Sequence, residues 1–305
     1  MSPVRGILLK ICALALFTIM ASLVKASVAH VPAGQAVFFR AVCSLPIILI
    51  WLIARGELAT GLRTRHPMTH IKRGLIGGSA MGLSFVALGY LPLPEVTVVG
   101  FIAPIITLIL AVLMLGETVR VFRWSMVALG LVGVLIVVWP RLTFGESEAD
   151  KLAAIGVACA LLAASLRALV QIHVRKMVKT ESTSAIVFYF AMTVSIGGLL
   201  TLPFGWVVPE LTILLYMVGS GLVGGVAQLL ITTAFRYAPA SVMAPFDYVS
   251  ILFSMIAGYF LFAEIPTSTM LLGAALVILS GVLIIWREHR IGTRRGPQEP
   301  VSSQT

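Results

Sequence analysis

Four ionisable side chains lie inside long apolar stretches of this sequence, namely Lys25, Arg40, Arg167 and Asp247. A charged group among apolar neighbours costs on the order of a few kcal/mol unless it meets water, a ligand or an opposite charge. These residues could therefore bind a ligand or a proton in a wet cavity, or they could neutralise one another in buried ion pairs.

Arg167 and Asp247 are the two charges that could meet. Arg167 lies seven residues before the end of the apolar segment 152–174, and Asp247 lies seven residues after the start of the segment 240–263. The end of the first segment and the start of the second are expected on the same, cytoplasmic side of the membrane. At about 1.5 Å per residue of helix, the two side chains therefore have the same depth from that side. They could form a structural ion pair, or the Asp247 carboxylate could bind a proton or a ligand.

Arg40 could bind an anion or a similar group, because a planar guanidinium suits a carboxylate, a phosphate or an imide-like edge. Glu95, at the start of a later apolar segment, is its expected neighbour. Lys25, near the end of the first apolar segment, is expected to extend its amine to the lipid headgroups. Three bases and one firmly buried acid predict a neutral or anionic ligand, and they argue against a cationic one.

Aromatic rings and prolines accompany these charges. Phe39 and Tyr248 each stand directly beside a charged residue and could stack on a flat ring system, although rings in membrane helices also serve as packing. Pro104 and Pro245 fall inside predicted helices, where a missing backbone hydrogen bond could leave a carbonyl free for a ligand.

Membrane helices must position these residues. The chain has 305 residues, of which 59% are hydrophobic and 11% are charged, whereas a soluble protein carries about 25% charged residues. Its solvent must therefore be lipid, and the polar tail 291–305 is expected to be disordered and cytoplasmic. A spanning helix needs about 20 apolar residues. The segments that qualify are 7–28, 34–54, 71–90, 93–115, 121–140, 152–174, 184–203, 211–235, 240–263 and 267–287.

The second half of the chain repeats the first. Residues 74–139 align with residues 221–286 at an offset of 147 and without a gap. Scarce residue types coincide in this alignment, namely Tyr90 with Tyr237, Pro92 with Pro239, Glu117 with Glu264 and Trp139 with Trp286. The coincidences indicate an internal duplication, with five helices in each of the repeats 1–145 and 146–290.

The repeats are expected to have opposite orientations, because five is an odd number of crossings. With the N-terminus inside, cytoplasmic segments hold 17 of the 22 Lys and Arg residues, Lys10 and Arg73 among them, and outer loops hold only Arg141 and Lys151. This bias predicts that both termini are cytoplasmic. The net charge of +10 is then a topology signal, and no nucleic-acid partner is expected.

Glycines recur at helical spacing in both repeats. Gly74, Gly78 and Gly82 share one helix face, and Gly221 and Gly225 repeat the first two positions. Small residues allow the backbones of neighbouring helices to approach closely. The pattern is compatible with tight packing and with a gating hinge.

Inverted repeats are typical of secondary transporters, because two similar halves facing opposite ways can open a shared site to either side in turn. An intramembrane enzyme would need clustered catalytic side chains, whereas the five histidines fall at helix ends or in loops. There is no GxxxxGK[ST] motif for ATP, and the three cysteines show no paired spacing. No catalytic residue, metal or cofactor is expected. The expected partner is a small-molecule substrate.

Each repeat carries a Glu at the end of its fourth helix, in Leu-Gly-Glu at 115–117 and Phe-Ala-Glu at 262–264. With ten helices in two five-helix repeats, the chain resembles the EamA-type drug/metabolite transporters from about Val4 to Trp286. The resemblance implies a multi-pass carrier of the bacterial inner membrane, with a central cavity lined by both halves. Such a chain can enclose a pathway alone, so a monomer or a weak homodimer is expected.

A finer resemblance involves four strings. PVRGILLK at 3–10, PAGQAVFFR at 32–40, PLPEV at 92–96 and FRWSMVALGLVGVLIVVWP at 122–140 are similar to the bacterial riboflavin transporter group. This similarity implies riboflavin uptake. The alternative is an exporter or exchanger of amino acids or related metabolites, including S-adenosylmethionine.

Overall fold

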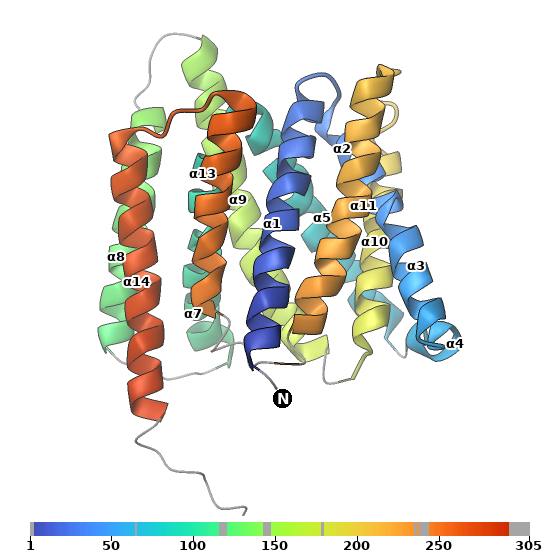
Figure 1. Cartoon of the computed structure of the whole chain (residues 1–305), viewed down its shortest axis with the longest axis horizontal. Coiled ribbons are helices and arrows are strands. Elements are labelled where there is room, and N and C mark those ends of the chain that lie inside the picture. The colour runs from blue at the N-terminus through green and yellow to red at the C-terminus, as the bar shows by residue number, and fades with distance from the viewer. Residues whose placement is uncertain are drawn as a thin grey trace, which may run out of the picture.

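The structure is a computed structural model that describes residues 3–64, 66–115, 121–142, 148–177, 180–234, 237 and 244–292. Within these ranges it is a bundle of helices without strands (Figure 1). The Glu at position 117 and residues 293–305 of the predicted tail lie outside the described residues.

The first half contains five helical segments that cross the bundle. Two of them are broken, and the short helix α4 follows the second. The helices are α1 (Pro3–Val28), α2 (Ala33–Val42), α3 (Ser44–Ala54), α4 (Leu58–Gly61), α5 (Pro67–Tyr90), α6 (Leu93–Gly100), α7 (Ile102–Leu115) and α8 (Val121–Leu142).

The second half also contains five crossing segments. Its fourth begins as the 3₁₀ helix η1, which continues directly into α13. The elements are α9 (Glu148–Met177), α10 (Thr183–Leu199), α11 (Leu211–Ala234), η1 (Ala244–Tyr248), α13 (Val249–Phe262) and α14 (Ser268–Gly292). The prediction of an all-α protein with ten helical segments is confirmed.

The two broken helices of the first half have a common cause. Proline lacks an N–H group, and its ring clashes with the carbonyl four residues earlier. Pro46 stands four residues after Val42, where α2 ends, and Pro104 stands four residues after Gly100, where α6 ends. The predicted segments 34–54 and 93–115 are therefore each two helices joined by a one-residue turn.

The bundle has the composition of a membrane protein. Among the described residues, four stretches are long and apolar enough to cross a bilayer, namely Val4–Val28, Ala33–Ala54, Glu148–Val174 and Leu211–Ile231. Large apolar side chains also point away from the bundle, as Trp139 (68% exposed) and Phe260 (76% exposed) do. Lipid is the solvent that accommodates such a surface.

The repeats are inverted with respect to each other. In Figure 1, α1 begins at the lower side of the bundle and α9, its counterpart, begins at the upper side. Helix contacts occur in matching pairs: α1 packs on α11 as α9 packs on α5, and α2 packs on α11 as α10 packs on α5. The helices that end the repeats, α8 and α14, pack on each other. A pseudo-two-fold axis in the membrane plane explains this pattern. Below, the side of the bundle where α1 begins is the N-terminal side, and the opposite one is the far side.

Glycines allow helices of the two repeats to approach each other closely. Gly74 and Gly78 of α5 face α10, and Gly221 and Gly225 of α11 face α2 and α3. A methyl group added at these four positions would meet, in order, the side chains of Thr193, Val194, Cys43 and Ile47. Gly82 differs, because a methyl group there would meet no atom within 4 Å. A gating role for these glycines stays a prediction.

Candidate functional site

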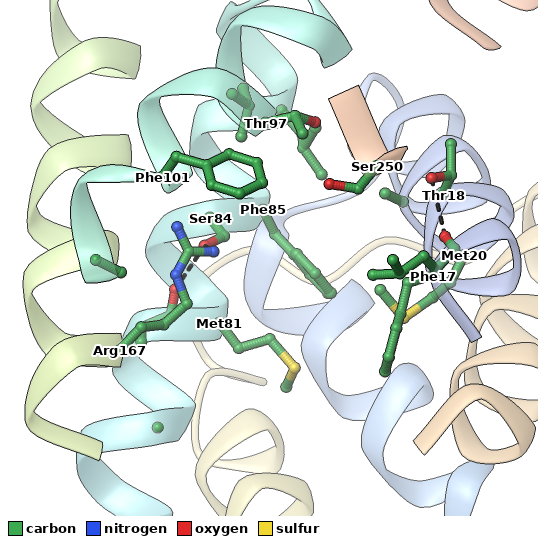
Figure 2. A pocket seen from close by; sticks show the side chains of 18 of the residues that line it. Phe17, Thr18, Met20, Met81, Ser84, Phe85, Thr97, Phe101, Arg167 and Ser250 are labelled. Carbon is green, nitrogen blue, oxygen red and sulfur yellow. Dashed lines mark hydrogen bonds between the residues drawn. The ribbon is translucent and has the colours of Figure 1, made fainter. Parts of the chain in front are cut away.

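A cavity of about 610 Å³ lies at the centre of the bundle, lined by helices of both repeats (Figure 2). Its charged lining residues within the described part of the chain are Arg40, Arg73, Arg167 and Asp247. Its walls also carry four aromatic rings, those of Phe17, Phe85, Phe101 and Phe190. Three guanidinium groups and one carboxylate give the cavity an excess of positive charge.

Arg40 is held on α2 just before the break of that segment. The residue is only 8% exposed, and its Nε atom is buried without a hydrogen-bond partner. Its side chain extends to Gly224 of α11, where a methyl group would stand 3.3 Å from Nη2. An incompletely bonded guanidinium on a cavity wall is suited to bind an anion.

Arg73 is a second such group, and sequence reasoning missed it by counting it only as a topology charge. Its guanidinium lies over the ring of Phe190, with Cζ 3.9 Å from the ring centroid. Its Nε and Nη1 atoms are buried without a partner. The available signal was Gly77, one helical turn further along α5, which leaves room for the side chain.

Arg167 reaches the cavity from α9. Its Nη1 atom donates to the Ser84 hydroxyl at 3.4 Å, and its Nη2 atom faces Gly100 at the end of α6. Figure 2 shows the guanidinium extending toward Phe101, beside that hydroxyl. This side chain also points into the space shared by the repeats.

Asp247 does not use Arg167 as the partner that its depth suggested. Its carboxylate accepts a hydrogen bond from Lys10 Nζ at 2.7 Å. Lys10 was assigned to the cytoplasmic surface, but it is 2% exposed and belongs to α1. Equal depth does not fix which helix faces which, and it is α1 that packs against η1. The Asp247 side chain is 44% exposed and lines the cavity.

Lys25 does not extend to the headgroups as expected. Its Nζ atom lies 2.8 Å from the Glu264 carboxylate and donates to the Leu91 carbonyl at 2.6 Å. Glu264 in turn accepts from the backbone N–H of Leu93 at 2.9 Å, at the start of α6. The Glu that ends the fourth helix of the second repeat thus connects that repeat to the first.

Of the remaining predicted site residues, some line the cavity and others pack elsewhere in the bundle. Pro104 lines the cavity, whereas Phe39 and Glu95 are absent from the lining; Glu95 is buried at 7% exposure. Phe39 instead packs edge-on against Phe38. Tyr248 stacks on Phe101 with centroids 4.9 Å apart, and the side chain of Pro245 lies outside the described residues.

Comparison with known proteins agrees with the fold and with the duplication. The model of the EamA-like transporter family matches residues 4–139 and again residues 154–286. A crystal structure with 19% sequence identity superimposes with a TM-score of 0.67, covering 94% of this chain and 98% of that one. At this identity the superposition supports the fold alone.

Several similar proteins are named as transporters. An S-adenosylmethionine uptake transporter of Rickettsia bellii is 30% identical over 263 residues, 86% of each chain. The pseudopaline exporter CntI of Pseudomonas aeruginosa is 28% identical over 92% of this chain and 95% of its own. A riboflavin transporter of Vibrio cholerae is 26% identical over 96% of each chain.

The fold and the relatives indicate the same class of protein. Two inverted helical repeats line one cavity that contains charged side chains, and the family model matches each repeat separately. The chain therefore belongs to the EamA-like transporter family.

Proposed function

We propose that this chain is a secondary carrier for a small metabolite that bears a carboxylate or another anionic group. The observation that carries the proposal is the charge of the cavity. Three arginines line it, and the lone lining carboxylate among the described residues already accepts from Lys10. An anionic group would satisfy guanidinium nitrogens that have no partner within the protein.

Alternating access is the proposed mode of transport. Two repeats of opposite orientation have similar energies in the two openings, because each opening places one repeat in the position that the other had. The cavity is lined by both repeats, so a rocking motion between them would expose it to either side.

S-adenosylmethionine is the first cargo to test. Its amino-acid carboxylate suits the arginines, and its adenine ring suits the aromatic walls. Its ammonium and sulfonium give the whole molecule a net positive charge, so this cargo departs from the neutral or anionic ligand that the sequence predicts, and its sulfonium would have to lie over a ring face. A relative named as its uptake transporter is 30% identical to this chain. The proposed direction is therefore inward.

Riboflavin is the second candidate, favoured by the sequence resemblance and by the four phenylalanines of the cavity. Its isoalloxazine ring is flat and suits stacking. It carries no charged group, however, and would leave the arginines without an anionic partner. The charge of the cavity therefore ranks it below a carboxylate-bearing cargo.

We further propose that the protein works as a monomer or weak homodimer in the bacterial inner membrane, with both termini in the cytoplasm. A cavity lined by helices of both repeats of one chain supports a single-chain pathway. The excess of Lys and Arg on one set of loops supports the orientation.

Transport by the purified chain in liposomes tests the proposed cargo. Labelled S-adenosylmethionine should accumulate with time and be displaced by the unlabelled compound, whereas riboflavin should not compete. Arg40→Gln should lower the initial rate by about tenfold or more, since a hydrogen bond to a charged group contributes about 1.5–3 kcal/mol. Arg55→Gln is the matched control, because Arg55 pairs with Glu57 away from the cavity. Entry of riboflavin without S-adenosylmethionine would shift the assignment to the second candidate, and entry of neither would contradict both.

A further inference from the structure

The breaks in the fourth helices of the two repeats are structural counterparts. The offset of 147 pairs Gly100 with Asp247 and Phe101 with Tyr248. The rings of Phe101 and Tyr248 stack with an interplanar angle of 19°. The two breaks therefore meet at the pseudo-two-fold axis. The residues beside one break can be compared directly with those beside the other.

Both repeats direct a cation at the break of the opposite repeat. Lys10 on α1, the first helix of the first repeat, reaches Asp247 in η1. Arg167 on α9, the first helix of the second repeat, reaches Gly100 at the end of α6. A methyl group at Gly100 would stand only 3.1 Å from the Arg167 Nη2 atom. The second repeat supplies an acid, Asp247, for the lysine of the first repeat. The first repeat supplies only a glycine, Gly100, for the arginine of the second repeat.

The hydrogen bonding of Arg167 differs from that of the two lysines of α1. The amine of Lys10 binds a carboxylate, and the amine of Lys25 binds a carboxylate and a backbone carbonyl. The Nη1 atom of Arg167 donates to the Ser84 hydroxyl at 3.4 Å, and this partner is uncharged and distant. A guanidinium in the protein interior is stabilised when its several N–H groups meet an anion.

We infer that the carboxylate of the cargo binds Arg167 beside Gly100, in the position that corresponds to the Asp247 carboxylate in the other repeat. This inference rests on the proposed function and adds the contact that selects the cargo. The glycine is required because a side chain there would occupy the space that the ligand oxygens need next to the guanidinium. Lys10 and Asp247 keep their own pair, and the ligand carboxylate supplies beside Gly100 the acid that Asp247 supplies in the other repeat.

The first test compares S-adenosylmethionine with its decarboxylated analogue, measured as equilibrium binding to the purified full chain. Wild-type protein should bind S-adenosylmethionine about tenfold or more tightly than the analogue. Arg167→Gln should remove most of this preference. Equal binding of both compounds to the wild type, or an unchanged preference in Arg167→Gln, would contradict the contact alone. Binding of neither compound would contradict the proposed cargo and the contact with it.

The second test separates a direct contact from the general field of the cavity by a double-mutant cycle. Gly100→Asp introduces the acid that the other repeat has, and Gly100→Asn is its uncharged control of equal size. In the presence of Arg167, the Asp variant should lose S-adenosylmethionine binding about tenfold more than the Asn variant and should melt at a higher temperature. In the Arg167→Gln background, the Asp and Asn variants should bind and melt alike. Strictly additive effects would overturn the inference.

Discussion

At the scale of single residues, the ion pair between Lys10 and Asp247 is the clearest case of unequal partners. The lysine is buried at 3% side-chain exposure, whereas the aspartate is 44% exposed and can be solvated from the cavity. Removal of either partner breaks the same contact, but the charge that is left behind differs in its access to water. The buried ammonium is the costlier group to leave alone.

Asp247→Asn should therefore destabilise the protein more than Lys10→Met. Loss of one partner of a buried pair costs about 3–5 kcal/mol, and the partial exposure of this pair reduces the expected loss for Asp247→Asn to about 2 kcal/mol. Thermal unfolding in detergent measures the difference. The double variant should recover stability relative to Asp247→Asn alone, and a Lys10→Met variant that is the less stable single mutant would contradict the burial of the lysine.

Sequence reasoning identified Arg40, Arg167 and Asp247 as intramembrane charges, and all three line the cavity. It assigned Lys10 and Arg73 to the surface because both lie near predicted helix ends, where basic residues usually record orientation. Distance along a helix gives depth but not direction. Only the packing of α1 against η1 and of α5 against α10 turns these two side chains inward.

At the scale of the helices, α5 shows why glycines on one face are not equivalent. Gly74 and Gly82 are two turns apart on the face that the sequence predicts to pack. The structure brings the side chain of Thr193 against Gly74, while nothing lies within 4 Å of a methyl group at Gly82. The close approach of α5 to α10 thus depends on the first glycine and not on the second.

Gly74→Ala should destabilise the protein, since overpacking against Thr193 costs about 1–3 kcal/mol. Gly82→Ala is the matched control in the same helix. It should be neutral or should stabilise by up to about 1 kcal/mol, because alanine is the better helix former. Unfolding midpoints of the two variants provide the comparison; equal effects would show that the spacing of the glycines, and not their neighbours, sets their role.

The positions of the helices were predictable, but their interruptions were not located. Apolar length and the duplication are sufficient to place ten segments, because each segment must cross the same thickness of lipid. The breaks at Cys43 and Phe101 required a further step. Pro46 and Pro104 signal an interruption, but the proline prevents the bond four residues earlier, so the turn precedes the proline itself.

At the scale of the whole molecule, the inverted duplication fixes the order and direction of the helices. It could be predicted because the scarce residues of the two halves align at one offset. The cross-repeat partners could not, since symmetry states only that contacts occur in pairs and does not say which helices meet. The pairs α1 with α11 and α5 with α9 are information that only the structure contains.

The predicted orientation can be checked with single cysteines in a variant that lacks the three native ones. Val208, in the connection between α10 and α11, is 99% exposed, and Gly56, in the connection after α3, is also exposed. A membrane-impermeant thiol reagent added to intact cells should label Val208→Cys, and it should label Gly56→Cys only after lysis. Labelling of both positions from the same side would contradict the odd number of crossings in each repeat.

The two lysines of α1 have a consequence for which conformation the protein prefers at rest. They are about 22 Å apart along the helix and hold the two ends of the η1–α13 segment, at Asp247 and at Glu264. The two ion pairs therefore connect α1 with both ends of this segment, and under the proposed alternating access we expect one pair to separate when the pathway opens on its side. The far-side pair is largely buried, with side-chain exposures of 14% and 15%, and it has further hydrogen bonds to Leu91 and to the start of α6. The acid of the N-terminal-side pair is 44% exposed. The pair on the N-terminal side should accordingly separate more readily than the far-side pair, so the N-terminal mouth should be the easier of the two to open before a ligand binds.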